Sequence, residues 1–414
     1  MIQEDNNLLP LAANEETFGV AIASTNQEDT LRVEAFLKQN FKFRHNVLNE
    51  KDEFFTLNTT DSDNASACWE LLDDRALNSI ILQVRRSGIC HGDPGPIIHL
   101  YVRSMASSLY NPVEEWLDRL PEWDGINRIA ELYSRIPGIT TEQIYWCGIW
   151  HRSMVAHWLQ MDTLHGNETV PILIGHQGAG KSTFGIRLIP NELRQYAMDH
   201  FNMGNKFDAD LALTNNLFVV LEEFDRFGPR QQAHLKQTLS RVKVNSRRAF
   251  GRVQDDRPRY ASFMANTNCE HPLTDSTGSR RFICIRIPDG TYLDNESPID
   301  YEQIYAQALH EIRHGARYWF TNDECREIEK ANAPYHNSLD LNEMILNIYK
   351  KPANDEPSQR VLVADIAVAL HRKFPEFKAD QNGKSRIGKA LRSMGFQPHD
   401  TNRGRAYHVV KLAS

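Results

Sequence analysis

Between Gly175 and Ser182 the chain reads GHQGAGKS, which fits the pattern G-x-x-x-x-G-K-[ST] without a mismatch. An apolar run from Val170 to Ile174 precedes it. Such a loop wraps a triphosphate in backbone N–H groups, and glycine permits the close approach and unusual dihedral angles that this requires. The pattern therefore predicts a strand, a phosphate-binding loop and a helix starting at Thr183, rather than an ordinary glycine-rich turn.

The positions of this loop have expected roles. Lys181 reaches the β- and γ-phosphates, and Ser182 coordinates Mg²⁺. ATP and Mg²⁺ are therefore the expected cofactors, and the helix start points its positive end at the anion. The expected nucleotide-binding residues are Gly175, His176, Gln177, Gly178, Ala179, Gly180, Lys181, Ser182 and Thr183.

Two carboxylates end a second apolar run. LFVVL, from Leu217 to Leu221, is typical of a strand buried on both faces of a parallel sheet, and Glu222 and Glu223 follow it. At the carboxyl end of such a strand one acid can hold Mg²⁺ and the next can polarise the attacking water. We expect Glu222 at the metal and Glu223 as the base; the alternative is that solvated acids simply end a strand.

A third predicted strand, Tyr260 to Ala265, leads into Asn266-Thr267-Asn268. A polar side chain at this tip can touch the γ-phosphate or its water. A polar loop then carries Arg280 and Arg281 into a fourth predicted strand that ends at Ile287. These arginines are either surface charge or, in a ring-forming ATPase, cations that reach the neighbouring subunit's γ-phosphate.

Basic residues concentrate in two regions of a chain whose net charge is −7. The stretch from Arg241 to Arg259 holds seven basic residues against two acids. Residues 337–414 hold thirteen against eight, in a predicted order of three helices and a hairpin that is typical of a winged helix. DNA binding or a protein contact could use this last region. For DNA, a helix with Lys384, Arg386, Lys389 and Arg392 would enter the major groove, and Arg403 and Arg405 would contact phosphates.

Composition sets broader bounds. The chain has 414 residues, 41% of them hydrophobic and 24% charged, enough for two or three domains with their own cores.

The acidic N-terminus and the short apolar runs predict neither a signal peptide nor a membrane segment. Six cysteines without a C-x-x-C pair predict reduced, buried thiols in the cytoplasm. In the predicted helix from Glu142 to Met161 the apolar residues, tryptophans among them, are spaced mostly three or four apart, so we expect this helix to pack against the ATPase core rather than to bind a cofactor.

In their order and compact spacing, the segments GHQGAGKST, VVLEEFD, RRAFGR, FMANTN and TDSTGSRRF resemble the virulence-associated protein E family. NPVEEWLDRLPEWDGINRI resembles the stretch that precedes the ATPase in that family, so the likeness covers Asn111 to Ile287. Members of the family are ATPases of phages and mobile elements, related to superfamily 3 helicases and to poxvirus-type primase-helicases. The last segment is similar to a C-terminal domain that some members carry.

The resemblance implies specific roles. Glu222 and Glu223 become the hydrolytic acids, although relatives commonly place Asp where Glu222 stands. Asn268, more than Asn266, becomes the nucleotide sensor. Arg280 or Arg281 becomes the arginine that acts on the neighbouring subunit. The implied contacts to single-stranded DNA in a central channel are Lys243, Arg247, Arg248 and Arg252.

The resulting hypothesis is an α/β protein with a P-loop AAA+/superfamily 3 helicase core and a parallel sheet. The expected units are an N-terminal α+β domain (1–105), a helical segment (106–168), the ATPase core (169–290), a helical linker region (291–336) and a winged-helix-like domain (337–414). The expected function is that of an ATP-dependent DNA helicase or translocase, as a hexamer, in replication of a phage or mobile element. The alternatives are a DNA-binding initiator or regulator that uses ATP for assembly, and a P-loop kinase of small molecules.

Overall fold

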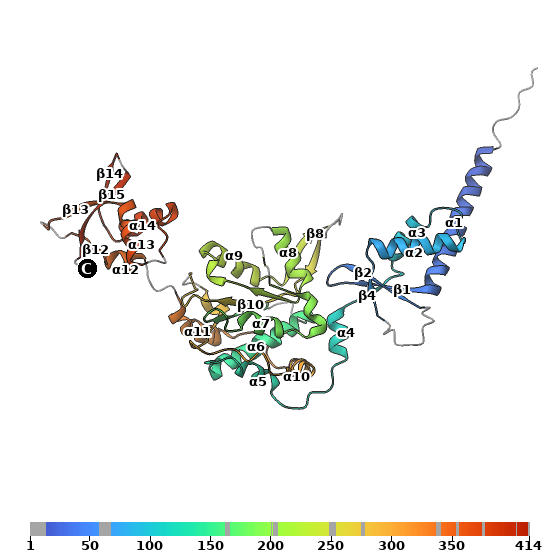
Figure 1. Cartoon of the computed structure of the whole chain (residues 1–414), viewed down its shortest axis with the longest axis horizontal. Coiled ribbons are helices and arrows are strands. Elements are labelled where there is room, and N and C mark those ends of the chain that lie inside the picture. Colours follow the sequence, from blue (N-terminus) through green and yellow to red (C-terminus); the bar gives the residue numbers. More distant parts are fainter. Residues whose placement is uncertain are drawn as a thin grey trace, which may run out of the picture.

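A computed structural model of the chain describes residues 14–57, 68–161, 166–199, 201, 206–247, 254–274, 278–336, 341–352, 356–374, 377–402 and 404–412. An N-terminal unit, a central α/β unit and a small C-terminal unit follow one another along the chain (Figure 1). Within the described ranges, no helix is long and apolar enough to cross a membrane.

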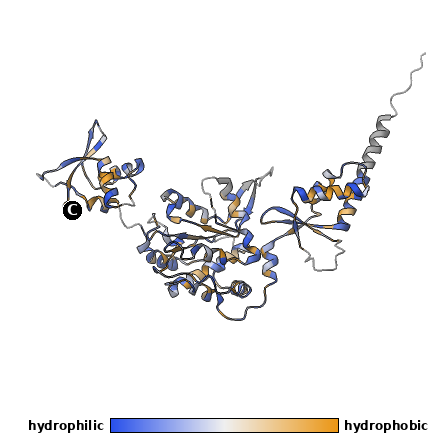
Figure 2. Cartoon of the chain, viewed as in Figure 1, coloured by the Kyte–Doolittle hydropathy of each residue, from blue (hydrophilic) through white to orange (hydrophobic). Residues whose placement is uncertain are grey.

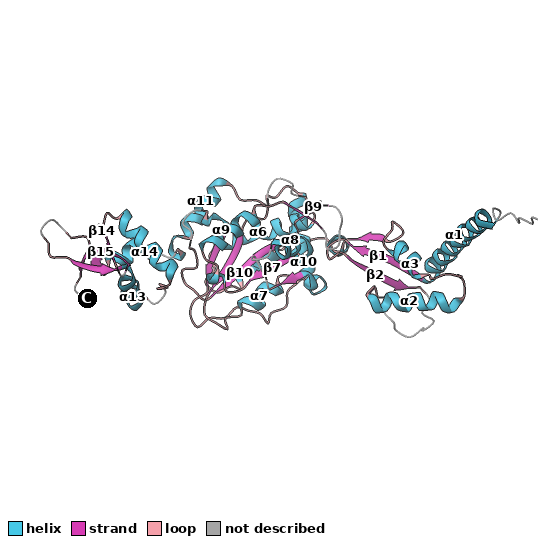
Figure 3. Ribbon diagram, turned by 90° about the horizontal axis from the view of Figure 1, so that it is seen from above, coloured by secondary structure: helices cyan, strands magenta, loops and turns pink. Residues whose placement is uncertain are grey.

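The central unit is built on a five-stranded sheet in which all neighbours are parallel (Figure 3). The strand order is β11-β5-β10-β7-β6. Every residue of β5, β7 and β10 is buried. Burial on both faces explains why β5 and β7 are apolar throughout rather than alternating, whereas β10 also carries the polar residues Ser262, Asn266 and Thr267. The strands are β5 (Val170–Ile174), β6 (Ala197–Met198), β7 (Phe218–Leu221), β10 (Ser262–Thr267) and β11 (Phe282–Arg286).

Two hydrophobic clusters cover the two faces of this sheet. Leu173 and Val220 pack into one cluster, whereas their strand neighbours Ile172 and Val219 pack into the other, as the alternation of side chains in a strand requires. The surrounding helices are α4 (Pro112–Asp118), α5 (Arg128–Ser134), α6 (Thr141–Trp158), α7 (Lys181–Arg187), α8 (Lys206–Asn215), α9 (Pro229–Leu239), α10 (Tyr301–Arg313) and α11 (Asn322–Ala331). In Figure 2 hydrophobic residues colour the strands of the central sheet and alternate with hydrophilic residues along the helices around it.

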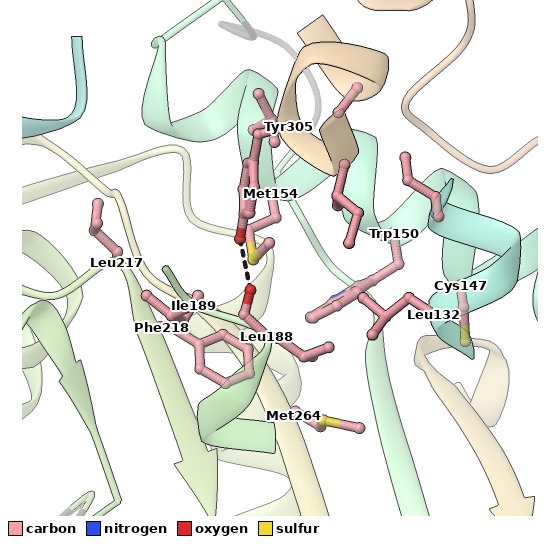
Figure 4. Close-up of a cluster of buried hydrophobic side chains, with 14 of the residues drawn as sticks. Leu132, Cys147, Trp150, Met154, Leu188, Ile189, Leu217, Phe218, Met264 and Tyr305 are labelled. Atoms are coloured by element: carbon pink, nitrogen blue, oxygen red, sulfur yellow. Dashed lines mark hydrogen bonds between the residues drawn. The ribbon is translucent and has the colours of Figure 1, made fainter. Parts of the chain in front are cut away.

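The tryptophans of α6 lie in the core, as predicted. Trp150 and Trp158 are fully buried, and the Trp158 ring stacks on Tyr305 of α10 at 5.4 Å between ring centroids. The Tyr305 hydroxyl donates to the Leu188 carbonyl at 2.9 Å, so the phosphate-loop side of the sheet is tied to α10 (Figure 4). The helix ends at Trp158 rather than at Met161, which is exposed.

The structure corrects three local expectations. Helix α7 begins at Lys181, not Thr183, because Gly180 adopts the left-handed conformation that starts the helix. Strand β10 extends to Thr267, so Asn266 belongs to the strand. Asn332, expected in a linker, is buried and donates to the carbonyls of Ser279 and Phe282.

The expectation for the cysteines is right only in part. All six thiols are free, and Cys147 and Cys284 are buried. Burial raises the pKa of both of these thiols, which keeps them protonated and unreactive. Cys68 is exposed, and the other three are partly exposed.

In the N-terminal unit the alternation of apolar and polar residues in FKFRHNVLNEKDEFFTL predicts a hairpin, and the structure contains it. Strands β1 and β2 pair antiparallel within a sheet of order β3-β2-β1-β4. Asn46 at the end of β1 donates to the Tyr196 hydroxyl of the central unit at 2.7 Å. The elements are α1 (Asn14–Asn40), β1 (Phe41–Asn46), β2 (Lys51–Thr56), β3 (Glu70–Leu71), α2 (Asp74–Ser87), α3 (Gly95–Val102) and β4 (Ser108–Tyr110).

The C-terminal unit has its own apolar core, centred on Ile387, Leu391 and Tyr407. Three helices and a terminal hairpin are present, together with two short strands before the second helix. The elements are α12 (Leu341–Leu346), β12 (Tyr349–Lys350), β13 (Gln359–Leu362), α13 (Val363–Lys373), α14 (Gln381–Ser393), β14 (Pro398–Thr401) and β15 (Gly404–Lys411).

One acid gives the central unit a pH-dependent stability. Glu324 of α11 pairs with Arg317 and accepts from Thr321 and from the Tyr145 hydroxyl of α6. The guanidinium of Arg317 is the main cause that lowers the pKa of Glu324 to about 2. Because the folded-state pKa lies below the unfolded value, the carboxylate stabilises the fold above about pH 4.5, and this contribution is lost as the pH falls toward 2.

We therefore expect Glu324→Gln to reduce the free energy of unfolding at pH 7 by ~3 kcal/mol. Urea unfolding of both proteins between pH 7 and pH 3 measures this difference, which should shrink on acidification. A difference that stays constant with pH would show that the carboxylate charge is not what stabilises this contact.

Candidate nucleotide-binding site

The phosphate loop connects β5 to α7 at the carboxyl edge of the sheet. Gly178 and Gly180 have φ angles of 85° and 87°, a region that favours glycine. At Gly180 a side chain would also collide with the amide nitrogen of Asn295. The loop therefore needs glycine at both positions for its shape, as the sequence pattern predicted.

Lys181 points back into this loop. Its ammonium group donates to the carbonyls of Gly175 and His176 at 2.8 and 2.7 Å and to Asn268 Oδ1 at 2.8 Å. The side chain is only 8% exposed. Burial lowers the pKa of Lys181, and the nearby Glu222 carboxylate partly opposes that shift.

An open cavity of about 460 Å³ lies over the loop and brings the predicted groups together. It is lined from three sides, by the loop itself, by the end of β7 and by the end of β10. Its lining residues are Gln177, Gly178, Gly180, Lys181, Ser182, Thr183, Glu222, Glu223, Asn266, Thr267 and Asn268. Of the residues predicted to bind nucleotide, Gly175, His176 and Ala179 belong to the loop but do not line the cavity.

Asn266 links the two residues expected at the metal. Its amide nitrogen lies 3.1 Å from Glu222 Oε1 and 3.5 Å from Ser182 Oγ. Asn266 Oδ1 is buried and has no partner within the described part of the chain. The Ser182 hydroxyl and the Glu222 carboxylate, which the Asn266 amide nitrogen links, are oxygen donors of the kind that Mg²⁺ prefers. The residues present therefore fit this ion.

Glu223 occupies an unusual backbone position. Its φ angle is 52°, uncommon for a residue other than glycine, and such strain concentrates at functional sites. Its carboxylate pairs with Arg226 at 2.6 Å. Two residues further along the chain, Asp225 accepts a hydrogen bond from the Thr267 hydroxyl at 2.6 Å, which holds the turn after β7 against the end of β10.

Arg280 and Arg281 lie at the amino ends of the parallel strands, opposite the end that bears the phosphate loop. Phe282 pairs with Val170 at the start of β5, whereas the phosphate loop follows Ile174 at its end. At 3.3 Å per residue the strand separates these ends by roughly 13 Å. Neither Arg280 nor Arg281 lines the cavity over the loop of its own chain.

Arg280 and Arg281 differ in their surroundings. Arg281 pairs with Glu168 at 3.2 Å and donates to the Ser240 hydroxyl at 3.1 Å, and its side chain is 17% exposed. Arg280 is exposed and forms no ion pair with the parts of the chain that the structure describes. The two arginines are therefore not equivalent, since Arg281 is held by partners in its own chain and Arg280 is exposed.

The basic stretch after α9 forms a hairpin of β8 (Lys243–Arg247) and β9 (Gln254–Pro258). Lys243 is exposed on it, and Arg247 ends β8. Arg248 and Arg252 lie outside the described residues. Of the seven basic residues counted in this stretch, Arg257 and Arg259 are buried and do not add to a basic surface.

Arg259 directly follows the last residue of β9 and fixes this end of the hairpin to the core. Its guanidinium donates to four carbonyls, those of Leu239, Arg241, Ala261 and Asn167. Burial lowers the pKa of Arg259 to about 10, which leaves it charged at neutral pH. Three of the four carbonyls belong to residues that are about twenty or more positions away in the sequence. The local sequence therefore contains no signal that separates this buried arginine from the exposed ones.

In the C-terminal unit the predicted basic face is present on α14. Arg386, Lys389 and Arg392 are exposed, and Lys384 is partly exposed. Arg405 of the terminal hairpin pairs with Asp400 at 3.0 Å, which offsets its charge. Arg403 lies outside the described residues.

The fold and the site define an α/β protein with a phosphate-loop motif at the carboxyl edge of a parallel sheet. A family model described as the virulence-associated protein E-like domain matches residues 117–337, more than half of the chain. The chain belongs to this family, as the sequence predicted.

Comparison with solved structures finds the C-terminal region of NrS-1 in apo forms. Two of these structures share 13% identity with the chain at TM-scores of 0.40 and 0.41, and each match covers 93% of this chain and 100% of the other. A third shares 12% identity at a TM-score of 0.40 and covers 92% and 99%. Similarity at this level says nothing about activity. No curated protein sequence matches the chain.

Proposed function

We propose that this protein is an ATP-dependent DNA translocase or helicase of the superfamily 3 type that serves the replication of a phage or mobile element. The observation that carries this proposal is the cavity in which Lys181, Ser182, Glu222 and Glu223 meet two strand-end asparagines. The strand order supports it, because the phosphate-loop strand β5 and the acid-bearing strand β7 flank β10, as in AAA+-like cores. Membership of the virulence-associated protein E-like family supports the link to mobile elements.

ATP hydrolysis would use the residues of this cavity in separate roles. The loop binds the phosphates through its backbone N–H groups, and Lys181 leaves the carbonyls that it now contacts to neutralise the γ-phosphate. Ser182 and Glu222 would hold Mg²⁺, which supplies charge neutralisation on the phosphates when bound. Glu223 orients the attacking water and accepts its proton. Asn268 is freed when Lys181 turns to the nucleotide, so it can contact the γ-phosphate.

The position of Arg280 supports a between-subunit site. Because Arg280 is exposed at the edge of the sheet opposite its own phosphate loop, it can complete the site of an adjacent copy. A ring of identical subunits, which we propose to be a hexamer, satisfies every such site at once. Arg281 would position Arg280 through its contacts with Glu168 and Ser240.

The nucleic-acid contacts of this proposal lie on two elements. The β8–β9 hairpin would present Lys243 to single-stranded DNA in the channel of the ring, and Arg247, Arg248 and Arg252 are proposed from the sequence as further contacts. The C-terminal unit has the helix and hairpin order of a winged helix, so α14 would contact double-stranded DNA through Arg386 and Lys389. The net charge of −7 fits binding that is limited to such patches.

The test is steady-state ATP hydrolysis with and without single-stranded DNA. We expect DNA to stimulate the rate. We also expect Lys243→Glu to reduce the stimulation and to flatten the salt dependence of DNA binding, since each phosphate contact contributes about 0.7 to the slope for single strands. Hydrolysis that is indifferent to DNA would contradict translocation. A single turnover that stalls after ATP binding would indicate an initiator that uses ATP only for assembly.

A further inference from the structure

The cavity over the phosphate loop provides for phosphates but not for a base. Its lining consists of glycines, hydroxyl groups, amides, carboxylates and one lysine, with no aromatic side chain. On the flank formed by β7 and β10 the lining includes the carboxylates of Glu222 and Glu223, which offer no face for stacking. A nucleobase therefore has to find its stacking surface on the other flank, where β11 runs beside β5.

The segment that follows β11 lies against the phosphate loop and is hydrogen-bonded to it. The Leu293 N–H donates to the Ala179 carbonyl at 3.0 Å, and the Asn295 amide donates to the Gly180 carbonyl at 2.9 Å. The segment is itself anchored, since Arg187 of α7 donates to the Ser297 carbonyl at 2.8 Å. Residues more than a hundred positions after the loop thus form part of its immediate surroundings.

This segment presents an aromatic side chain to solvent beside the loop. Tyr292 is 65% exposed, and its ring meets the His176 ring edge-on at 5.3 Å between centroids. A large exposed aromatic held next to a phosphate loop offers a face on which any base can stack.

The same segment also holds an unused acceptor. While its amide nitrogen bonds Gly180, Asn295 Oδ1 is buried without a partner within the described part of the chain. Buried polar atoms without partners are uncommon in folded proteins. An amide oxygen can accept from the exocyclic amino group of adenine, whereas guanine presents a carbonyl oxygen at the same position.

We propose that Tyr292 and Asn295 form the nucleobase subsite of this protein, with Tyr292 as the stacking surface and Asn295 as the acceptor that favours adenine over guanine. The subsite rests on the proposed nucleotide-dependent function and extends it to the choice of base. Through its bond to Gly180, Asn295 also couples base recognition to the shape of the phosphate loop.

The experiment measures equilibrium binding of ATP, GTP and inorganic tripolyphosphate to the full-length protein by calorimetry. We expect Tyr292→Ala to weaken ATP binding on the order of 10- to 100-fold. Tripolyphosphate binding should stay unchanged, because the variant loses only the stacking contact with the base. Tyr292→Phe, which keeps the ring, should bind ATP like the unmodified protein. Asn295→Ala should bring the affinities for ATP and GTP close together.

Each other outcome overturns the subsite. If Tyr292→Ala binds ATP normally, the base does not stack there; if the variant loses tripolyphosphate equally, Tyr292 acts on the loop and not on the base. If the unmodified protein binds both tripolyphosphate and ATP, and Tyr292→Ala binds them with the same affinities, only the subsite fails. Should it bind neither compound, the proposed function fails as well.

Discussion

Lys181→Met is expected to lower the rate of ATP hydrolysis by at least about 100-fold, the size of effect seen when one charge-stabilising donor is lost from an active site. The ammonium group is the only cation that lines the cavity over the phosphate loop within the described residues. Its present partners, two carbonyls and the Asn268 amide oxygen, hold it at the position from which it can turn to the γ-phosphate. Methionine keeps an unbranched side chain that is one heavy atom shorter, and it removes the charge and the hydrogen-bond donors.

Steady-state phosphate release measures this loss, and thermal unfolding of both proteins is the control. Because burial already lowers the pKa of Lys181, removal of the charge should cost the fold little. Hydrolysis that persists in a folded Lys181→Met protein would place the reaction outside this cavity.

Arg280→Ala is expected to lower the turnover number of the assembled protein by about 10³-fold or more, as loss of an arginine finger does in related phosphoryl transfers. ATP affinity should stay close to that of the unmodified protein, since Arg280 lies at the opposite edge of the sheet from its own loop. Arg281→Ala should behave differently and reduce stability as well, because it loses the contacts with Glu168 and Ser240.

Mixing two inactive variants separates action in trans from action in cis. Lys181→Met subunits keep a functional Arg280, and Arg280→Ala subunits keep a functional loop. An assembly of both contains interfaces in which the two intact halves meet, so hydrolysis should recover in the mixture. If subunit exchange is demonstrated and no activity returns, Arg280 does not complete a neighbouring site.

Local sequence was sufficient for the elements that bear the chemistry. The apolar runs before Gly175 and Glu222 are strands β5 and β7, because a strand that is covered on both faces has to be apolar throughout. The hairpin of β1 and β2 and the buried tryptophans of α6 were predictable for the same kind of reason, a period in the sequence that matches one buried face. Helix boundaries were less certain, as the start of α7 at Lys181 shows.

Contacts between distant segments could not be predicted in this way. The bond from Asn295 to Gly180 joins residues 115 positions apart, and the link from Asn266 to Glu222 joins two strands. Nothing in their local sequences marks these asparagines, since such pairings depend on the strand order and on how the chain returns over the loop. Arg257 and Arg259 show the same limit, because a charge count treats buried and exposed arginines alike.

By itself the sequence determined the phosphate-loop motif, the acids that follow β7, the parallel character of the sheet and the family, because each depends on residue types at fixed short spacings. Only the tertiary structure decided that Asn266 joins Ser182 to Glu222, that Arg280 is the exposed arginine of its pair and that Tyr292 stands beside the loop. The physical reason is that short-range order follows from backbone preference and hydrophobic period, whereas the approach of side chains from different strands follows from the packing of the whole sheet.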